Sequence, residues 1–304
     1  MNDHKLYQPG ILEGVPSVAR FVNFVIPDKG ADPQAIKEAF QRLSPLANGS
    51  DVVLGIGPSL VAALGAQVPG LHEFPDYPGA AVKVPSTPGT LWCWVRGDDL
   101  GDLLHQTRKV QRALAPAFAV RHVVDGFRHS WSGTHGRDLT GYEDGTENPE
   151  GEKAEEAAFA RGHGPGMDGS SFVAVQQWVH DLDAFEALGG DEANHHFGRD
   201  RVTNEELDDA PEWAHVKRTA QESFDPEAFM LRRSMPWMIG MQAGLMFVAF
   251  GKSLQAFETQ MRRMAGLDDG IVDAMFRISR PVNGAYFWCP PMRGGQLDLR
   301  QLGL

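Results

Sequence analysis

The stretches LGIGPSLVAAL, residues 54–64, and FVAFGKSLQAF, residues 247–257, share one pattern. In each, an apolar run passes through a small-residue turn into Ser-Leu and then into a segment with helical spacing of apolar residues. Short apolar runs bounded by glycine are typical of buried strands, and the spacing that follows is typical of an amphipathic helix. The recurrence predicts two copies of one α+β unit.

Further segments of the same kind lie around both stretches. A strand-like run over residues 17–26 precedes a helical segment over residues 32–43, for which Asp32 is the predicted N-cap. Residues 89–114 and 171–188 each read as a strand followed by a helix. The first helix is predicted to bury the apolar face made by Ile36, Ala39, Phe40 and Leu43.

Repeated strand and helix units of this length favour the ferredoxin-like pattern, in which an antiparallel sheet carries its helices on one face. The segment GAYFWCPP, residues 284–291, is predicted to be the closing strand. We therefore expect an α+β protein with two ferredoxin-like halves, residues 1–140 and 141–304, placed face to face.

Composition excludes several classes of partner. The 304 residues carry a formal net charge of -12 and a pI near 5.3, which argues against a nucleic acid or an anionic membrane surface as partner. Only two cysteines occur, no apolar run approaches the roughly 20 residues that span a bilayer, and the opening residues resemble neither a secretory signal nor a transit peptide. We expect a cytoplasmic protein.

The long connection over residues 126–170 is rich in Gly, His and acidic residues and lacks strand or helix periodicity, which is typical of functional loops. It contains GYEDGTENP, residues 141–149. Its acidic residues are consistent with a surface turn, a calcium loop or a catalytic carboxylate, although the spacing of an EF-hand is not met.

Histidines and arginines of the C-terminal half offer further chemistry. The adjacent pair His195 and His196 reads as surface histidines, and His215 in WAHVKR is by itself consistent with a packed or capping residue. Arg232 and Arg233 follow an apolar run in FMLRRSMPW, and a buried arginine needs an anion. Asp144 is one available candidate.

Taken together, these residues resemble the dye-decolorising peroxidases. The GxxDG motif of that family matches Gly141 to Gly145, and TENP follows it as in many members. The resemblance extends over nearly the whole chain, because further segments follow the motif in the family's order: a spaced His, LRRSMP, GLMFVAFGKS and DGIVDAMF. Within the family, the chain is similar to the B-type, YfeX-like members. The resemblance implies a duplicated ferredoxin-like fold, like a dimeric α/β barrel, whose two sheets sandwich one haem b.

The resemblance also implies roles for individual residues. His215 resembles the haem-iron ligand, with Asp273 as its carboxylate partner and Asp269 as the fallback, while Asp144 and Arg232 resemble the distal catalytic pair. Arg199 is a candidate partner of a haem propionate, and Arg233 stands where many relatives have a non-basic residue. The remaining residues expected at the cofactor are Gly145, Thr146, Glu147, Ser234 and, as a dry distal wall, Leu245 and Phe247.

The implied reaction is reduction of hydrogen peroxide through an oxoferryl porphyrin radical, with oxidation of dyes, phenolics or other small organic donors. A guanidinium near a carboxylate lowers its pKa by about 1–3 units, so we expect Asp144 to be ionised but a weak base. Arg232→Leu is then predicted to slow formation of the oxoferryl intermediate more than Asp144→Ala. Two rival functions are a haem-handling or iron-releasing protein with the same pocket and a haem-free acid/base hydrolase that uses Asp144. The resemblance also implies a homo-oligomer.

Overall fold

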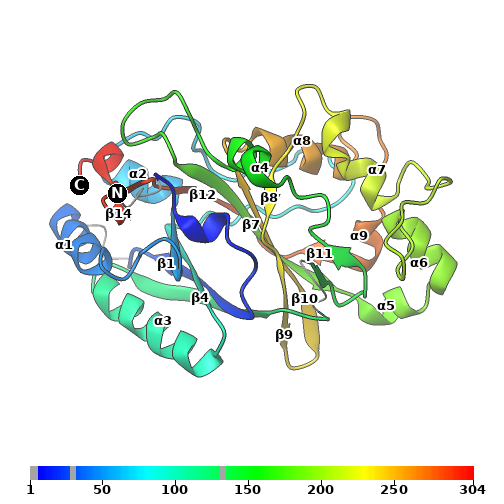
Figure 1. Cartoon of the computed structure of the whole chain (residues 1–304), viewed down its shortest axis with the longest axis horizontal. Coiled ribbons are helices and arrows are strands. Elements are labelled where there is room, and N and C mark those ends of the chain that lie inside the picture. Colours follow the sequence, from blue (N-terminus) through cyan, green and yellow to red (C-terminus); the bar gives the residue numbers. More distant parts are fainter. Residues whose placement is uncertain (1–5, 28–31, 131–134) are drawn as a thin grey trace.

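A closed antiparallel barrel forms the centre of the molecule (Figure 1). The computed structural model describes residues 6–27, 32–130 and 135–304. Among these residues, ten strands form one sheet in the order β11-β7-β12-β2-β3-β1-β4-β9-β10-β8, and an added β7–β10 pairing closes the ring.

Each half contributes four strands in the ferredoxin-like order, fourth-first-third-second. In the first half these are β1 (Val18–Val25), β2 (Val52–Ile56), β3 (Leu91–Gly97) and β4 (Ala119–Phe127). In the second half they are β7 (Ser171–His180), β9 (Met235–Ile239), β10 (Gln242–Gly251) and β12 (Ala285–Cys289). The contacts β4–β9 and β12–β2 join the halves edge to edge. The predicted α+β, duplicated ferredoxin-like fold is confirmed.

The sequence similarity that led to this prediction does not match the structural repeat. Helix α2 (Pro58–Ala63) follows β2, the second strand of its half, whereas α8 (Gln255–Met264) follows β10, the third. The structural equivalent of β10 and α8 is β3 with α3 (Leu100–Leu114). A buried strand, a tight turn and an amphipathic helix form a local pattern that recurs at several junctions. Its repetition therefore indicates the class of fold, but it does not indicate which strands of the two halves are equivalent.

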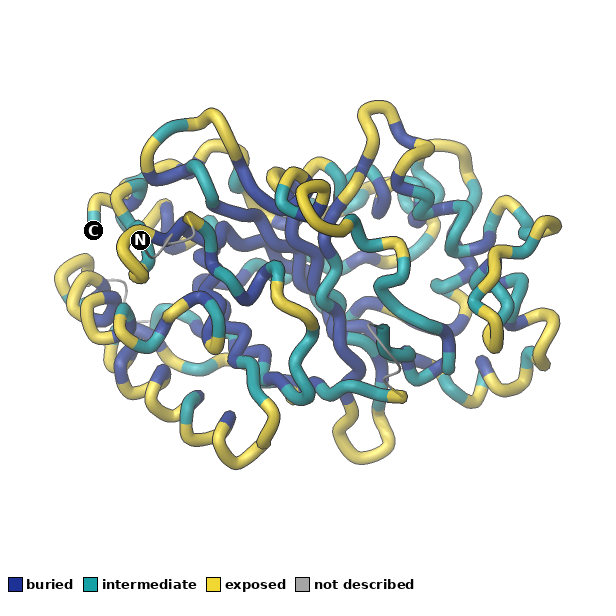
Figure 2. Tube along the Cα trace, viewed as in Figure 1, coloured by how far each residue is buried: buried dark blue, intermediate teal, exposed yellow. Residues whose placement is uncertain are grey.

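The predicted amphipathic helix is confirmed. Helix α1 (Pro33–Leu43) begins after Asp32, whose side chain accepts a hydrogen bond from the Gln34 amide, and its buried residues are the four predicted ones. These side chains pack in the layer between the outer face of the barrel and the helices. The barrel interior is filled by a second cluster rich in aromatic rings, including Phe21, Trp92, Trp94, Phe250 and Phe287. Figure 2 shows the strands at the centre as the most deeply buried part of the chain.

The connection over residues 126–170 is more ordered than its sequence indicates. It contains a small hairpin of β5 (Gly136–Arg137) and β6 (Glu143–Asp144), followed by helix α4 (Gly151–Ala158); residues 131–134 of this segment lie outside the described residues. Helix α4 was missed because its buried residues are only alanines, which give a weak hydrophobic signal, and because Glu150 makes no side-chain cap.

Short elements of the C-terminal half lie at the centre and on the right of Figure 1. They are α5 (Leu182–Glu186), α6 (Gly190–Phe197), α7 (His215–Thr219), β8 (Leu231–Arg232), α9 (Met275–Ile278) and β11 (Ser279–Pro281). The other small elements are β13 (Met292–Arg293), β14 (Gln296–Leu297) and the 3-10 turns Pro9–Ile11, Gln221–Ser223 and Arg300–Leu302. Across the described ranges, no helix combines the length and apolar character needed to cross a membrane.

Candidate active site

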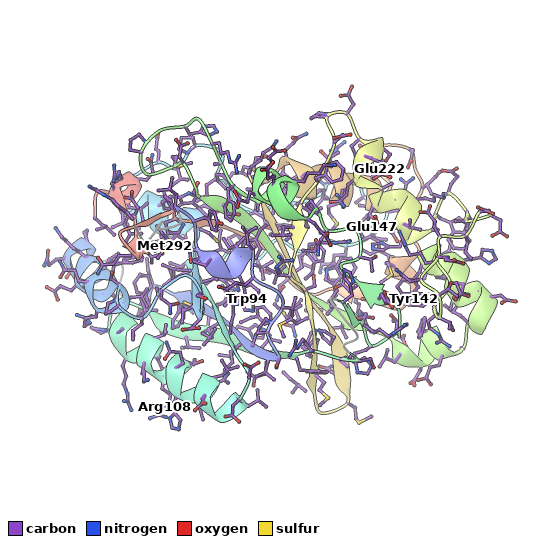
Figure 3. All side chains as sticks on the ribbon, viewed as in Figure 1. Trp94, Arg108, Tyr142, Glu147, Glu222 and Met292 are labelled. Carbon is purple, nitrogen blue, oxygen red and sulfur yellow. The ribbon has the colours of Figure 1, made fainter. Side chains whose placement is uncertain are left out.

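The loop GYEDGTENP forms a rigid bend that presents Asp144. Asp144 pairs with Gly136 across the β5–β6 hairpin, and Gly145 follows with φ of 83°, a conformation that favours glycine. A Cβ at Gly145 would lie 3.0 Å from the side-chain nitrogen Nδ2 of Asn148. Tyr142 holds the loop against α6, because its hydroxyl donates to the Asn194 side chain at 2.6 Å. Figure 3 shows Tyr142 in the C-terminal half of the molecule, together with Glu147.

Asn148 fixes Arg232 next to this loop. The Asn148 side chain accepts a hydrogen bond from the Arg232 amide at 2.7 Å and donates one to the Arg232 carbonyl at 3.1 Å. Arg232 lies on β8 opposite Ala249 of β10. The loop with Asp144 and the strand with Arg232 are therefore held together by a side chain that imitates backbone pairing.

His215 contributes to the same region from α7. It is the first residue of α7, and its Nδ1 lies 2.8 Å from Oδ2 of Asp273, a carboxylate with 0% exposure. The other oxygen of Asp273 accepts the Met275 amide at 2.8 Å. Asp269, the fallback partner, instead accepts a hydrogen bond from Arg218 at 2.7 Å. Since Nδ1 is engaged, Nε2 is the ring nitrogen left for the cavity.

An inner cavity separates His215 from Asp144 and Arg232. Its two connected parts, of about 90 and 270 Å³, share these three residues, His180, Leu245, Thr219 and Met275. Leu245 and Phe247 on β10 stand opposite Trp178 and Gln176 on β7, and all four line the smaller part. Every residue that lines either part has a number of 138 or higher. The cavity therefore lies on the outer face of the C-terminal strands, and the two sheets do not enclose it as the expected sandwich would.

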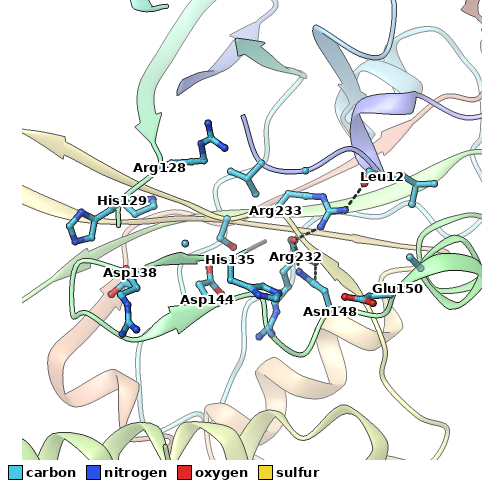
Figure 4. A pocket seen from close by; sticks show the side chains of 18 of the residues that line it. Leu12, Arg128, His129, His135, Asp138, Asp144, Asn148, Glu150, Arg232 and Arg233 are labelled. Carbon is cyan, nitrogen blue, oxygen red and sulfur yellow. Dashed lines mark hydrogen bonds between the residues drawn. The ribbon is translucent and has the colours of Figure 1, made fainter. Parts of the chain in front are cut away.

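A second, outer cavity of about 490 Å³ lies beyond Asp144 and Arg232, which line both (Figure 4). Figure 4 shows Arg233, Arg128 and His129 around it. Arg233 donates to the carbonyls of Ile11, Leu12 and Arg232, and burial, with Arg96 nearby, lowers its pKa to about 10. Ser234 lines this outer cavity, and its hydroxyl accepts the Val248 amide at 3.3 Å.

The electrostatics of Asp144 differ from the sequence-based expectation. Burial raises the pKa of Asp144, and the nearby Asp138 carboxylate adds to the increase. Arg232 acts in the expected direction and lowers this pKa, but burial outweighs it. The expected lowering of the Asp144 pKa is wrong, because it counted the guanidinium and left out the loss of solvent.

The other predicted residues lie at the rim. Gly145, Thr146, Glu147 and Arg199 all line the larger part of the inner cavity. The Arg199 guanidinium donates to Glu147 at 2.6 Å, so this arginine is already paired with a carboxylate. His195 is partly exposed and pairs with Asp209 at 3.4 Å. The prediction of a surface histidine is wrong for His196, which is 1% exposed because its ring packs against Trp213, and its Nδ1 is 2.9 Å from the Glu192 carbonyl. Across the described residues, no cluster of three or more His, Cys, Asp or Glu side chains suited to a metal ion is found, which gives no support to a calcium loop.

Sequence reasoning missed three residues that the site depends on. Asn148 was visible in the GTENP segment, but its role needs the partner strand. Asp138 and His180 lie 42 positions apart, and their side chains meet at 3.1 Å. No local pattern indicates that contact.

Comparisons with known proteins show the family of this chain. A family model described as "Dyp-type peroxidase, C-terminal" matches residues 135–294, and its N-terminal counterpart matches residues 8–128. The chain belongs to the Dyp-type peroxidase family. It is therefore a peroxidase, and so an oxidoreductase.

Individual Dyp-type relatives match over most of their length. The chain is 31% identical to a dye-decolorizing peroxidase of Mycolicibacterium paratuberculosis, covering 84% of this chain and 71% of the relative. It is 30% identical to one of Rhodococcus erythropolis, covering 92% and 85%. Among solved structures, an arginine-to-leucine variant of Rhodococcus jostii DypB in complex with haem matches with a TM-score of 0.83 and 26% identity over 92% of this chain and 94% of that chain. A dye-decolorizing protein from Vibrio cholerae matches with a TM-score of 0.80 and 25% identity over 97% and 98%.

Proposed function

We propose that this Dyp-type peroxidase binds haem b through His215, reduces hydrogen peroxide and oxidises dyes, phenolics or other small organic donors. One observation carries the proposal: His215, bonded to Asp273, lines the same cavity as Asp144 and Arg232. The haem in the matching Rhodococcus jostii structure supports the same cofactor here.

The inner cavity fits a haem. In the described part of the chain, the buried Nε atom of Arg232 and the buried amide nitrogen of Gln176 have no hydrogen-bond partner, and both residues line this cavity. An unsatisfied buried donor is costly, so it points to a polar group that completes the site. The smaller part of the cavity offers the apolar surface that a porphyrin face requires, from Met230, Leu245, Phe247, Phe257, Met261 and Met264.

Asp273 would control the proximal side. A carboxylate that accepts the Nδ1 proton fixes the His215 tautomer with Nε2 free to bind a metal, and it increases the electron donation of the ring. The bound haem would supply the iron that takes up peroxide and the redox equivalents.

Asp144 and Arg232 would control the distal side. Uneven cleavage of the O–O bond requires a base that moves a proton between the two peroxide oxygens and a cation that stabilises the developing negative charge. Asp144, whose pKa burial raises, is suited to hold that proton, and Arg232 supplies the charge. Leu245 and Phe247 would exclude water. Gly145, Thr146 and the Arg199–Glu147 pair would form the rim, and Ser234 would line the peroxide entrance.

The test is a direct one. Purified protein supplied with haem should show a Soret absorption band and bleach an anthraquinone dye only when peroxide is added. His215→Ala should lose the band, and His195→Ala, at a partly exposed histidine of α6, should keep it. A parent without a Soret band refutes the proposal. Release of iron without peroxide, in the absence of bleaching, would favour the haem-handling function instead.

We also propose the finer assignments that the family leaves open. The match to DypB supports a B-type, YfeX-like subtype. The strand order supports two halves that divide near residue 140, and two free, buried cysteines are consistent with a cytoplasmic protein. A homo-oligomer is supported by the tip of the β9–β10 hairpin, where Met238, Ile239 and Met241 are 62%, 58% and 99% exposed. Light scattering after chromatography should show a dimer or larger assembly that Met238→Lys with Met241→Lys dissociates.

A further inference from the structure

A buried three-residue network borders the inner cavity. His180 Nε2 lies 3.1 Å from Oδ1 of Asp138, and His180 Nδ1 lies 2.7 Å from the hydroxyl of Ser279. Ser279 is the cross-strand neighbour of His180 in the β11–β7 pair. The exposures are 8% for Asp138, 8% for His180 and 4% for Ser279, so none of them is a surface contact.

The hydrogen bonds of this network admit two protonation states. The other Asp138 oxygen accepts both the amide and the hydroxyl of Thr140, at 2.9 and 2.6 Å. Burial by itself raises the pKa of Asp138, but the hydrogen bonds from His180 and from Thr140 outweigh it and lower this pKa to about 2. An ionised Asp138 only accepts, so His180 Nε2 carries a proton in both states.

The second proton is governed by Ser279. Its hydroxyl lies within bonding distance of His180 Nδ1 and, at 3.3 Å, of the Val179 carbonyl. When the hydroxyl donates to Nδ1, His180 is neutral. When it turns to the carbonyl, Nδ1 can donate to the Ser279 oxygen and His180 is an imidazolium. Rotation of one hydroxyl therefore lets the ring take or release a proton with every polar atom satisfied.

The network is tied to the distal catalytic pair. The amide of Asp138 donates to the Tyr142 carbonyl at 2.8 Å, which closes the hairpin that carries Asp144. Asp138 lines the outer cavity and the larger inner part, and His180 lines both inner parts. The charge of Asp138 acts on Asp144 through space and opposes its ionisation. A cation on His180 would oppose that effect.

We propose that His180 is a positioning residue for Asp144: its hydrogen bond to Asp138 holds the hairpin in place, and its ring, when protonated, favours the ionised form of Asp144 by its positive charge. This role rests on the proposed peroxidase function. No step on the peroxide is assigned to His180 itself.

Other charged groups around the same cavity are largely balanced. Glu147 pairs with Arg199, Glu206 with Lys217, and Glu143 with Arg137. Glu222 is exposed at the rim. Of the groups that face His180 across the inner cavity, Asp144, Arg232 and His215 remain, and the variants below leave all three unchanged.

The test compares three variants of the holoprotein with a matched control. His180→Gln keeps a donor for Asp138 but cannot become a cation, Asp138→Asn removes the negative charge, and Ser279→Ala removes the acceptor of the imidazolium proton. His195→Gln changes a more exposed histidine with a carboxylate partner, Asp209. Two quantities are measured over about pH 4 to 9: the rate constant of the reaction with peroxide and, without peroxide, the absorption spectrum of the resting holoprotein.

The expected shifts have opposite signs. His180→Gln should move the acid limb of the rate profile and the spectral midpoint to higher pH by about one unit. Ser279→Ala should give a smaller shift in that direction, Asp138→Asn a shift to lower pH, and His195→Gln none. Unchanged midpoints in His180→Gln, or shifts in the same direction in His180→Gln and Asp138→Asn, would overturn the proposal. Loss of a merely structural contact would not shift the midpoint in opposite directions when a positive and a negative charge are removed. A parental holoprotein that does not react with peroxide would refute the proposed function, and the resting spectra would still decide on His180.

Discussion

Replacing Asp273 with Asn should weaken haem binding while leaving the volume of the side chain almost unchanged. The two oxygens of Asp273 accept from His215 Nδ1 and from the Met275 amide, both at 2.8 Å, and the side chain is fully buried. An amide offers only one oxygen. One of these two donors must therefore face an NH2 group, and the remaining bond loses its charge.

The size of the effect follows from these contacts. An unsatisfied buried donor costs about 1–3 kcal/mol, and each 1.4 kcal/mol is about tenfold in an equilibrium constant. A central value of about 2 kcal/mol predicts that haem dissociates about 30-fold more readily, within the range of about 10–100-fold typical of a lost partner of a metal-binding histidine. The loss of the anion should also reduce electron donation from His215 and slow the reaction with peroxide.

The assay is transfer of haem from the holoprotein to an excess of a haem-scavenging globin, followed by absorbance. The control is Asp269→Asn, because Asp269 accepts from Arg218 and the Ile271 amide at the surface and not from His215. Its haem transfer should stay within about twofold of the parent, because neither bond of Asp269 involves His215. The reasoning is refuted if Asp273→Asn retains haem as tightly as the parent, or if Asp269→Asn loses it equally fast.

Three further predictions concern the distal side. Arg232→Leu should slow the stopped-flow reaction with peroxide more than Asp144→Ala does, because it removes the stabilising charge and also lets the pKa of Asp144 rise further; the reverse order would contradict this. Asn148→Ala should lower the urea midpoint by the equivalent of about 1–3 kcal/mol and slow the peroxide reaction, since it removes the acceptor of the Arg232 amide and one of the two donors to the Arg232 carbonyl. The folded pKa of Asp138, about 2, lies below the ordinary Asp value of about 3.9, so its contribution to stability is present above about pH 4 and is lost as pH falls toward 2; the urea midpoints of the parent and Asp138→Asn should therefore converge over that interval.

Local sequence determined the elements and the class of fold. The apolar spacing of Ile36, Ala39, Phe40 and Leu43 predicted the buried face of α1, and Asp32 predicted its start, because helix periodicity and capping act over a few residues. Buried strands followed by helices predicted the ferredoxin-like halves for the same reason. The sequence did not determine which strands correspond in the two halves, since β2 and β10 have similar local patterns but different neighbours in the barrel.

The resemblance predicted some residues of the site, and other features of the site were not predicted. The motif and the spaced histidine identified Asp144, His215, Arg232 and Asp273 as candidates, and the structure brings these four to one cavity or its border. The pairing of Arg199 with Glu147 and the outer position of Ser234 depend on contacts between distant segments. Helix α4, with alanines as its buried residues, had no strong local signal.

What the sequence alone determined is the chemistry available: carboxylates on a glycine-rich bend, a histidine, two arginines and an α+β chain of two similar halves. Tertiary structure alone decided the electrostatics, because desolvation depends on everything that surrounds a group. Burial raises the pKa of Asp144, whereas the neighbouring Arg232 alone had led us to predict a lower pKa. The fold also brings His180 of β7 to within hydrogen-bonding distance of Asp138, next to the β5–β6 hairpin. Both results follow from three-dimensional packing of residues that are distant in the chain, and short-range patterns do not contain that information.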